Sequence, residues 1–423
     1  MTRNGVCQAL AFVLGLAPLA GAADEGARDL LVATRAGLRA GVMHRLAAHG
    51  AVVETIPQLG VARLVVPANA RVPDAKRAIA ADPEVRHVER NDRGGGGFVP
   101  DDPDFALQWY LENAGQGGGT PGVDIGAATG WERTRGSPEV VVAVLDTGIE
   151  ADHPEFADRL LPGFDFVNGD DDPAADHPHG VQVTGLLAAD ADNGLEIAGV
   201  DHAARILPVK VLDATNGGTV FDLAEGLVFA ADQGADVINM SLIDYPADSP
   251  ILSDALDYAR DRGAVLVACA GNHGLGDADR SGPGAYPQTI SVGWTSDADV
   301  RGAVPAAGTS SATGSALDVV APGPRFFSGC SAATPVVAGI ASLLLSLDPA
   351  LGHEGVHALL VASAADRVGP PDEDVPGRDD YFGYGRVDLA EAVQLVPEAD
   401  GSWLPAGMGL VALRRRARSR RPA

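Results

Sequence analysis

The chain has 423 residues, of which 46% are hydrophobic and 21% charged, and its formal net charge at pH 7 is -26. This is the composition of a globular protein with room for more than one domain, and a core of roughly 300 residues can bury most of its apolar surface. The acidic excess argues against nucleic acid as a partner, because phosphate binding needs clustered lysine and arginine.

Residues 1–22 are typical of a secretory signal peptide. Arg3 supplies a positive charge, residues 6–19 are apolar, and small residues at 20–22 provide a cleavage site. The apolar run is too short for a stable membrane span. We therefore expect bacterial-type export, which would leave the protein secreted or at the cell surface.

Residues 23–93 are expected to form a small α+β domain. Strand-like segments at 30–33, 52–55, 62–66 and 85–89 combine with helical patterns at 38–49 and 75–81. Their order, strand-helix-strand-strand-helix-strand, is that of the ferredoxin-like plan. The glycine run at 94–97 then predicts a flexible linker.

Residues 94–395 are expected to form a larger α/β domain. Strand-like runs occur at 140–145, 206–212, 235–242, 264–270 and 289–292, with helical segments at 221–233 and 250–262. This alternation favours a doubly wound, mostly parallel sheet with helices on both faces. Ligands of such sheets bind beyond the carboxyl ends of the strands, which is where Asp146 and Asn272 fall.

Three separate segments carry residues suited to nucleophilic hydrolysis. Asp146 ends an apolar strand, and His179 precedes an apolar helical stretch. Ser331 begins another helix, with Pro335 expected in its first turn. A serine hydroxyl needs a neighbouring base, a carboxylate can orient that base, and a helix N-terminus stabilises the oxyanion. Taken singly, Asp146 would be a turn residue and Ser331 a helix cap, whereas His179 would be a helix cap or a metal ligand beside His177.

These segments resemble the signatures of subtilisin-like serine proteases. The resemblance rests on Val144-Leu145-Asp146-Thr147-Gly148, on His179-Gly180 with Gly185, and on Gly329-Cys330-Ser331 with Pro335. It implies Asp146 as orienting acid, His179 as general base and acid, and Ser331 as nucleophile. It also implies Asn272 as side-chain donor to the oxyanion. The expected reaction is peptide-bond hydrolysis through an acyl-enzyme.

The resemblance also implies partners. Protein or peptide substrates would bind along Ser241-Leu242-Ile243 and beside Gly271, and the ferredoxin-like unit resembles the family's prodomain. That prodomain is an intramolecular chaperone and inhibitor, which the enzyme itself removes. Ile243 stands where the family usually has glycine. We therefore expect a narrowed specificity pocket that favours small or slender substrate side chains.

Other departures from the family favour a competing prediction. Val181 and Cys330 stand where the family usually has threonine, so two hydroxyls are lost. Residues 324–327 alone separate Gly323 from Ser328, where the family has a dozen or more residues. Because a misplacement of about 1 Å matters for catalysis, a catalytically impaired surface or binding module of subtilisin fold is the alternative.

Two further features have open interpretations. Once Cys7 is lost with the signal peptide, Cys269 and Cys330 remain, and they are either two buried thiols or a disulfide. Acidic loops suit structural calcium, and the family resemblance points to two candidate sites. The candidate ligands are Glu155, Asp192 and Asn193 at one site, and Asp170, Asp172 and Asp176 at the other. The alternative is that these acids are solvated loop residues.

The last segment, residues 396–423, differs in character. An 11-residue apolar run at 403–413 precedes six arginines between Arg414 and Arg421. A helix of that length rises about 16 Å, well short of the roughly 30 Å hydrocarbon core. With Val396-Pro397-Glu398 upstream, the segment resembles a PEP-CTERM sorting signal, which would engage C-terminal sorting machinery. A disordered basic tail is the alternative.

Overall fold

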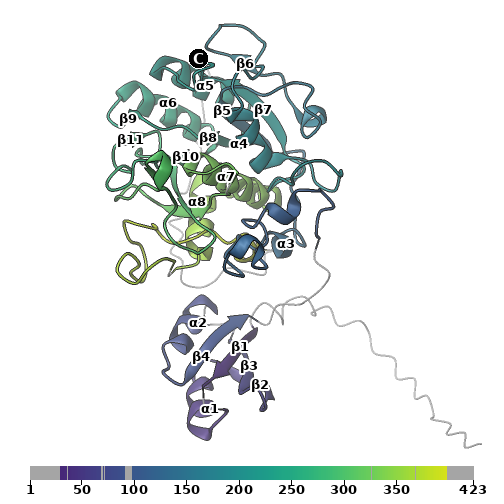
Figure 1. The fold of residues 1–423 in the computed structure, drawn as a ribbon, viewed down its shortest axis with the longest axis vertical. Helices are drawn as coiled ribbons and strands as arrows, with labels where there is room; N and C mark the ends of the chain where they lie inside the picture. Colours follow the sequence, from purple (N-terminus) through teal and green to yellow (C-terminus); the bar gives the residue numbers. More distant parts are fainter. Residues whose placement is uncertain are drawn as a thin grey trace, which may run out of the picture. The chain divides into compact units, whose positions relative to one another are not determined.

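The computed structural model describes residues 29–397, apart from 36, 68, 69, 71, 91–97, 325 and 367. The predicted signal peptide, the glycine linker and nearly all of the C-terminal segment lie outside the described residues. The chain divides into two compact units, and the second begins at Gly96 (Figure 1).

The first unit is a four-stranded antiparallel sheet with two helices. Its elements are β1 (Asp29–Thr34), α1 (Ala40–Leu46), β2 (Ala51–Ile56), β3 (Val61–Val65), α2 (Val72–Ala80) and β4 (Val85–Arg90). Alternate strand residues such as Leu30, Val32 and Leu64 pack with Leu46 and Ile79 of the helices. The strand order β2-β3-β1-β4 confirms the predicted ferredoxin-like plan.

The second unit is built on a seven-stranded parallel sheet of order β15-β12-β10-β8-β5-β7-β6. Its strands are β5 (Val141–Asp146), β6 (Phe164–Asp165), β7 (Arg205–Lys210), β8 (Val237–Met240), β10 (Val265–Cys269), β12 (Ile290–Thr295) and β15 (Val319–Pro322). Between β7 and β8 the chain crosses β5, so the winding direction reverses there. Such a reversal point is where parallel sheets bind ligands.

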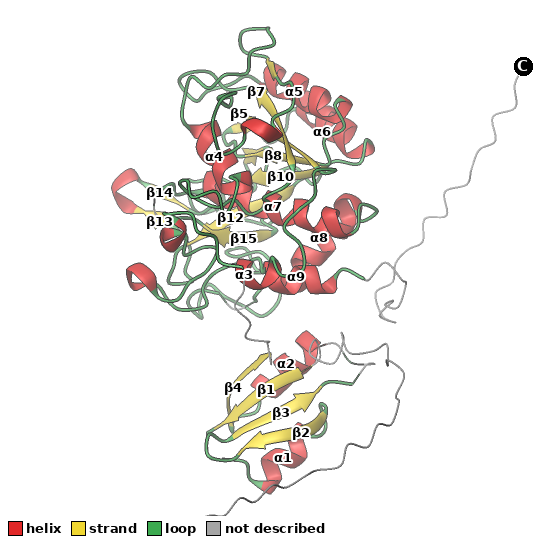
Figure 2. Ribbon diagram, turned by 90° about the vertical axis from the view of Figure 1, so that its right-hand side faces the viewer, coloured by secondary structure: helices red, strands yellow, loops and turns green. Residues whose placement is uncertain are grey.

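Helices cover both faces of this sheet, as predicted. They are α3 (Ala127–Gly130), α4 (His179–Ala188), α5 (Val220–Asp232), α6 (Pro250–Asp261), α7 (Cys330–Leu347), α8 (Gly352–Ser363) and α9 (Leu389–Leu395). Val142 and Val144 of β5 belong to the core shared with α4 and α7, whereas Val141, Ala143 and Leu145 belong to the core shared with α5 and α6. Figure 2 shows α4 on one side of the strands and α5 and α6 on the other.

Two small antiparallel hairpins complete the second unit. One pairs β9 (Tyr245–Pro246) with β11 (Ser281–Gly282), and the other pairs β13 (Ala303–Val304) with β14 (Thr309–Ser310). The β9–β11 pair begins two residues after Ile243, so it continues the segment that was predicted to bind substrate.

Helix α7 is the central helix of the second unit. Among the described residues it is the one helix long and apolar enough to cross a membrane, but 89% of it is buried. It packs against α4 and against β8, β10, β12 and β15, so its apolar circumference is that of a core helix. Pro335 lies in its second turn rather than the predicted first turn. Because proline has no N–H, the Ser331 carbonyl instead accepts a hydrogen bond from the Ser241 hydroxyl at 3.1 Å.

Candidate active site

Asp146 and His179 form a buried hydrogen-bonded pair at the carboxyl end of β5. Oδ1 of Asp146 accepts from Nδ1–H of His179 at 2.7 Å, and Asp146 is fully buried. The Thr147 hydroxyl accepts from the Gly180 backbone N–H at 2.9 Å, which fixes the first turn of α4 beside β5. The carboxylate therefore holds the imidazole with its proton on Nδ1, and Nε2 is left as the basic atom.

The electrostatics of His179 follow from this pair. Burial lowers the pKa of His179, while the charge of Asp146 and its hydrogen bond raise it, and the net effect is a pKa above the ordinary histidine value. Oδ2 of Asp146 is buried without a hydrogen-bond partner in the described part of the chain. A positive charge on the His179 imidazole would thus be stabilised by a carboxylate that solvent does not screen.

Ser331 shares one cavity with His179. The cavity has a volume of about 580 Å³, and Ser331, His179 and Asn272 all line it. The Ser331 hydroxyl donates to the Ser241 carbonyl at 3.3 Å. Within the described residues it makes no hydrogen bond to His179. Hydrogen bonds between catalytic groups are often absent or long in ligand-free proteins, and a rotation about χ1 would redirect the hydroxyl.

Asn272 is held beside the start of α7. Its Oδ1 accepts from the Cys330 backbone N–H at 3.0 Å, so its amide nitrogen remains available as a donor. Gly329 has φ +105°, and a Cβ there would lie 3.1 Å from Asn272 Oδ1, so only glycine suits this position. The Ser331 backbone N–H belongs to the first helical turn and has no intrahelical acceptor. Together, the Asn272 amide and this N–H can bind an oxyanion.

Cys269 and Cys330 form a disulfide. Cys269 ends β10 and Cys330 begins α7, and their Cα atoms lie 5.2 Å apart. Both residues are fully buried. Of the two possibilities that the sequence left open, the structure has the bridge.

The predicted substrate-binding segment lies along the same cavity. Ser241, Leu242 and Ile243 follow β8, and all three line the cavity wall. Gly271 is not among the residues that line it. With φ +124° and the Asp277 carboxylate where its Cβ would stand, Gly271 shapes the turn that presents Asn272.

Some cavity residues had no signal in the sequence analysis. Phe327, from the shortened loop, also lines the cavity, and its ring meets that of His179 edge to face with centroids 5.4 Å apart. Leu212 reaches the cavity from the loop after β7, and Tyr245 from the start of β9. The sequence offered one indication that Phe327 could lie in the cavity, namely its position four residues before Ser331. The short loop leaves Ser331 in the cavity beside His179.

The first candidate calcium cluster is partly assembled. Asn193 Nδ2 donates to Glu155 Oε2 at 3.0 Å, whereas Glu155 Oε1 is buried without a partner among the described residues. Burial raises the pKa of Glu155 and the nearby charge of Asp102 raises it further, against the hydrogen bond from Asn193. The Asp192 carboxylate instead accepts from the Asp101 backbone N–H. Asp102, which the sequence analysis missed, lies near enough for its charge to act on Glu155, while its own oxygens accept from the backbone N–H groups of Asp192 and Asn193.

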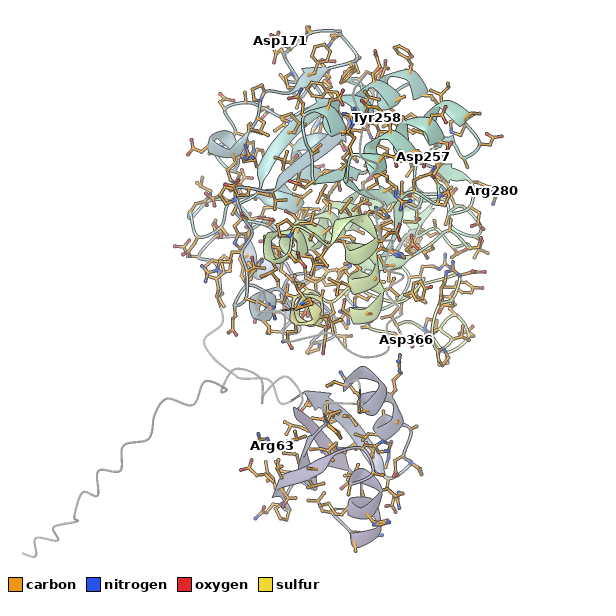
Figure 3. The ribbon with its side chains drawn as sticks, turned by 180° about the vertical axis from the view of Figure 1, so that it is seen from behind. Arg63, Asp171, Asp257, Tyr258, Arg280 and Asp366 are labelled. Atoms are coloured by element: carbon orange, nitrogen blue, oxygen red, sulfur yellow. A yellow bond between two sulfur atoms is a disulfide. The ribbon has the colours of Figure 1, made fainter. Side chains whose placement is uncertain are left out.

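The second candidate calcium cluster is not assembled. Asp176 pairs with Lys210 at 2.9 Å, while the carboxylates of Asp170 and Asp172 accept from backbone N–H groups two residues further on. The neighbouring Asp171 projects from a peripheral loop (Figure 3). Over the described residues, no group of three or more His, Cys, Asp or Glu side chains is arranged to hold a metal ion.

A zinc-type pattern on α8 was also missed in the sequence. Residues 353–357 read His-Glu-Gly-Val-His, the spacing that binds zinc in metalloproteases. Nδ1 of His353 accepts from the Leu266 backbone N–H at 3.3 Å, so the ring proton sits on Nε2 and neither nitrogen offers a free lone pair. His357 Nε2 hydrogen-bonds to Asp318 at 3.2 Å. These histidines border a different cavity, of about 330 Å³, and their bonds account for them as packing residues.

Comparison with known proteins agrees with this geometry. The model of the Subtilase family matches residues 137–385, and that of the Fervidolysin N-terminal prodomain matches residues 42–91. Thermitase from Thermoactinomyces vulgaris is 34% identical over 308 residues, which cover 70% of this chain and all of thermitase. A protease structure from Pseudoalteromonas arctica PAMC 21717 is 26% identical with a TM-score of 0.61, covering 71% of this chain and all of that one.

Two longer relatives match over part of their length. The thermophilic serine proteinase of Bacillus sp. (strain AK1) is 35% identical over 274 residues, or 62% of this chain. The halolysin-like extracellular serine protease Nep of Natrialba magadii is 30% identical over 379 residues, or 84% of this chain. The matches span 64% of the Bacillus proteinase and 65% of Nep.

Proposed function

Since the chain belongs to the subtilase family, we propose that it is a secreted serine endopeptidase made as an autoprocessed zymogen. The observation that carries the proposal is the 2.7 Å bond from His179 Nδ1 to the buried carboxylate of Asp146, in a cavity that also holds Ser331. This arrangement gives a base of fixed tautomer beside a nucleophile at a helix N-terminus.

The first half of the reaction forms the acyl-enzyme. Ser331 Oγ turns from the Ser241 carbonyl to His179 Nε2, which takes its proton as Oγ bonds to the peptide carbonyl carbon. The carbonyl oxygen becomes an oxyanion, which accepts hydrogen bonds from the Asn272 amide and the Ser331 backbone N–H. His179 then gives the proton to the leaving amine, the C–N bond breaks, and the acyl group stays on Ser331.

The second half releases the new carboxyl terminus. A water molecule gives a proton to His179 Nε2 while its oxygen attacks the acyl carbon, and a second oxyanion forms in the same place. His179 returns the proton to Ser331 Oγ as the ester bond breaks. Asp146 keeps its charge throughout and stabilises the imidazolium.

The first unit is proposed to be the prodomain. The Fervidolysin prodomain match over residues 42–91 supports this assignment. The maturation cleavage then falls between Asn91 and Asp104, and the released unit acts as an intramolecular inhibitor. A disulfide is typical of exported proteins, so the Cys269–Cys330 bridge supports secretion, as does the likeness to the extracellular protease Nep.

Calcium is proposed as a structural ion at Glu155 only. The buried, unpartnered Oε1 of Glu155 and the neighbouring Asp102 carboxylate supply oxygen ligands of the kind that calcium prefers, whereas Asn193 turns its Nδ2 towards Glu155 and would have to rotate its amide to add an oxygen. The ion would offset the repulsion between buried like charges and would tie the loop at Asn193 to the rest of the unit. At the second acidic cluster the salt bridge from Lys210 to Asp176 supplies the positive charge instead.

A fluorophosphonate probe tests the proposed activity. We expect the probe to label the mature protein on Ser331 and labelling to disappear in Ser331→Ala. Ser328→Ala, a change at an exposed serine three residues away, serves as the matched control and should keep the label. The Ser331→Ala chain should also stay at its precursor mass, because self-cleavage is lost.

The competing function is a non-catalytic binding module of the same fold. It is favoured by the hydrogen bond of the Ser331 hydroxyl to the Ser241 carbonyl and by the shortened loop at residues 324–327. If the protein, freed of its first unit, takes no label and cleaves no unfolded protein substrate, the binding module replaces the protease.

A further inference from the structure

The Cys269–Cys330 disulfide joins the two segments that carry the proposed nucleophile and the oxyanion donor. Cys330 directly precedes Ser331, and Cys269 lies three residues before Asn272. Both cysteines are fully buried, and the proposed reaction uses neither sulfur atom. The bridge therefore connects parts of the site without taking part in the chemistry.

We propose that this disulfide is a positioning element of the oxyanion site, which holds the Asn272 side-chain amide in register with Ser331. The inference rests on the proposed function and adds two positioning residues to it. The disulfide sets the distance between the end of β10 and the first turn of α7 covalently. Catalysis tolerates a misplacement of only about 1 Å, so this distance matters for the reaction.

The hydrogen bonding of Cys330 gives the disulfide its route to Asn272. The Cys330 backbone N–H donates to Asn272 Oδ1 at 3.0 Å. This bond sets the orientation of the Asn272 amide: Oδ1 faces the Cys330 N–H, and the Nδ2 donors are left for the substrate. If the first turn of α7 moved away from β10, Cys330 would lose this contact and the Asn272 amide would be free to rotate.

The first turn of α7 has bonds from the Ala332 and Ala333 N–H groups to the Gly329 carbonyl, but it lacks two features that usually fix a helix start. Pro335 cannot donate to the Ser331 carbonyl, which accepts from Ser241 instead. Gly329, at the helix N-cap, has no side chain with which to cap the helix. The position of this turn is therefore set in part by bonds to β10, to Asn272 and to the segment after β8, and the disulfide is the covalent one among them.

A purely stabilising role would leave a different signature. The bridge links residues 61 positions apart, and a cross-link of that span restricts the unfolded chain. A stabilising cross-link of this kind changes the folded fraction, whereas a positioning element changes the turnover of each folded molecule through Asn272. The two roles separate in a double-mutant cycle.

The cycle combines Cys269→Ala/Cys330→Ala with Asn272→Ala, and kcat and KM are measured per folded molecule on one peptide substrate. Removing the bridge should lower kcat about 10-fold to 100-fold at nearly constant KM when Asn272 is present. When Asn272 is already alanine, the same change should alter kcat by less than about 2-fold, because there is no longer an amide to position.

Control variants separate misfolding from misplacement. Ser342→Ala removes the hydrogen bond from Ser342 to buried Asp201, which is also made by α7, and should lower the melting temperature without changing kcat. If the alanine pair does not fold, Cys269→Ala/Cys330→Thr replaces it, since threonine is the usual family residue before the nucleophile.

Each outcome has a defined meaning. Equal kcat losses with and without Asn272, or a loss of melting temperature alone, would overturn the positioning role. Two free thiols in the unfolded, unreduced protein would also overturn it. A wild type without any Ser331-dependent hydrolysis would sink the proposed function and this inference together, whereas an active wild type with an unaffected bridge variant sinks the inference alone.

Discussion

The active-site cavity and the acidic cluster at Glu155 belong to the same unit, and each has one buried carboxylate oxygen without a hydrogen-bond partner among the described residues, but the groups beside the two carboxylates differ. In the cavity, protein groups bond to one another: His179 to Asp146, Cys330 to Asn272, and Ser331 to the Ser241 carbonyl. At the cluster, Glu155 keeps a buried oxygen without a partner, and like charges surround it.

This difference indicates where each region gets its order. In the cavity, Asp146, His179 and Asn272 are already held by bonds within the chain, and the Ser331 hydroxyl needs a side-chain rotation to reach His179. The acidic cluster gathers several carboxylates around Glu155, with Arg159 as a nearby positive charge, and a protein interior tolerates such an excess of like charge poorly unless a cation is present. Perturbing the cavity should therefore change the rate of reaction, and perturbing the cluster should change stability.

The largest effect in this comparison is expected from Asn272→Ala. The loss of one oxyanion donor should lower kcat about 10²–10³-fold with little change in KM, a range that comes from subtilisin itself. The melting temperature should change little, because the amide contributes one hydrogen bond to Cys330. Steady-state kinetics on a peptide substrate checks this, and a kcat within 3-fold of wild type would place the oxyanion elsewhere.

A second change tests the wall of the cavity. Ile243 stands beside Leu242 along the predicted substrate-binding segment. Ile243→Gly should raise kcat/KM for substrates with phenylalanine before the cleaved bond about 10-fold to 100-fold relative to those with alanine, as expected when several methylenes are removed from a pocket. Efficient cleavage after phenylalanine by the wild type would show that Ile243 does not narrow the pocket.

Sequence reasoning reached the fold because its signals are local. The buried strand at 141–146 is an uninterrupted apolar run and was expected within one residue at each end, and the helix at 330–347 was expected to begin at Ser331, one residue later than it does. Asp146, His179 and Ser331 were found because each stands in a short motif at an element boundary. The structure then brings the three segments to one end of the sheet.

Contacts between segments that are distant in the chain could not be predicted from the sequence. Asp102 and Glu155 are 53 positions apart, and nothing local indicates that one charge perturbs the other. The pairing of Cys269 with Cys330 stayed open because cysteine spacing alone does not fix connectivity. The Lys210 salt bridge to Asp176 similarly removes a carboxylate that the sequence had offered to calcium.

At the acidic cluster, the property expected to change is thermal stability rather than the reaction rate. Chelation of the mature protein should lower its melting temperature by roughly 5–10 °C, which corresponds to an ion present at about a hundred times its dissociation constant. Differential scanning calorimetry with and without calcium measures this difference. An unchanged melting temperature would remove calcium from the proposal.

Glu155→Gln is a stricter test of calcium binding, because its effect on the melting temperature should have opposite signs without and with calcium. In chelator the variant should melt higher than the wild type, since it removes a buried charge whose pKa is raised by burial and by Asp102. In calcium it should melt lower, because a charged ligand is lost. Asp172→Asn is the matched control at the unassembled cluster and should behave like wild type in both conditions.

The smallest expected effect is a shift of the pH dependence of kcat/KM to higher pH. The pKa of His179 is raised by Asp146 by more than burial lowers it, so the acidic limb of kcat/KM should have its midpoint above the ordinary histidine value of about 6.5. The stabilisation from the charged pair is complete below the unfolded pKa and is lost as pH rises through the folded one. Activity should therefore rise over the range in which this stabilisation fades.

A second histidine could produce the same limb, and a variant separates the two. His273 is partly exposed at the turn after Asn272, and its hydrogen bond to Asp244 also raises its pKa. His273→Gln should leave the midpoint of the acidic limb where it is if His179 is the base. A midpoint that moves by half a unit or more in His273→Gln would assign the titration to the rim of the cavity. The buried pair would then have no measurable role in setting the pH dependence.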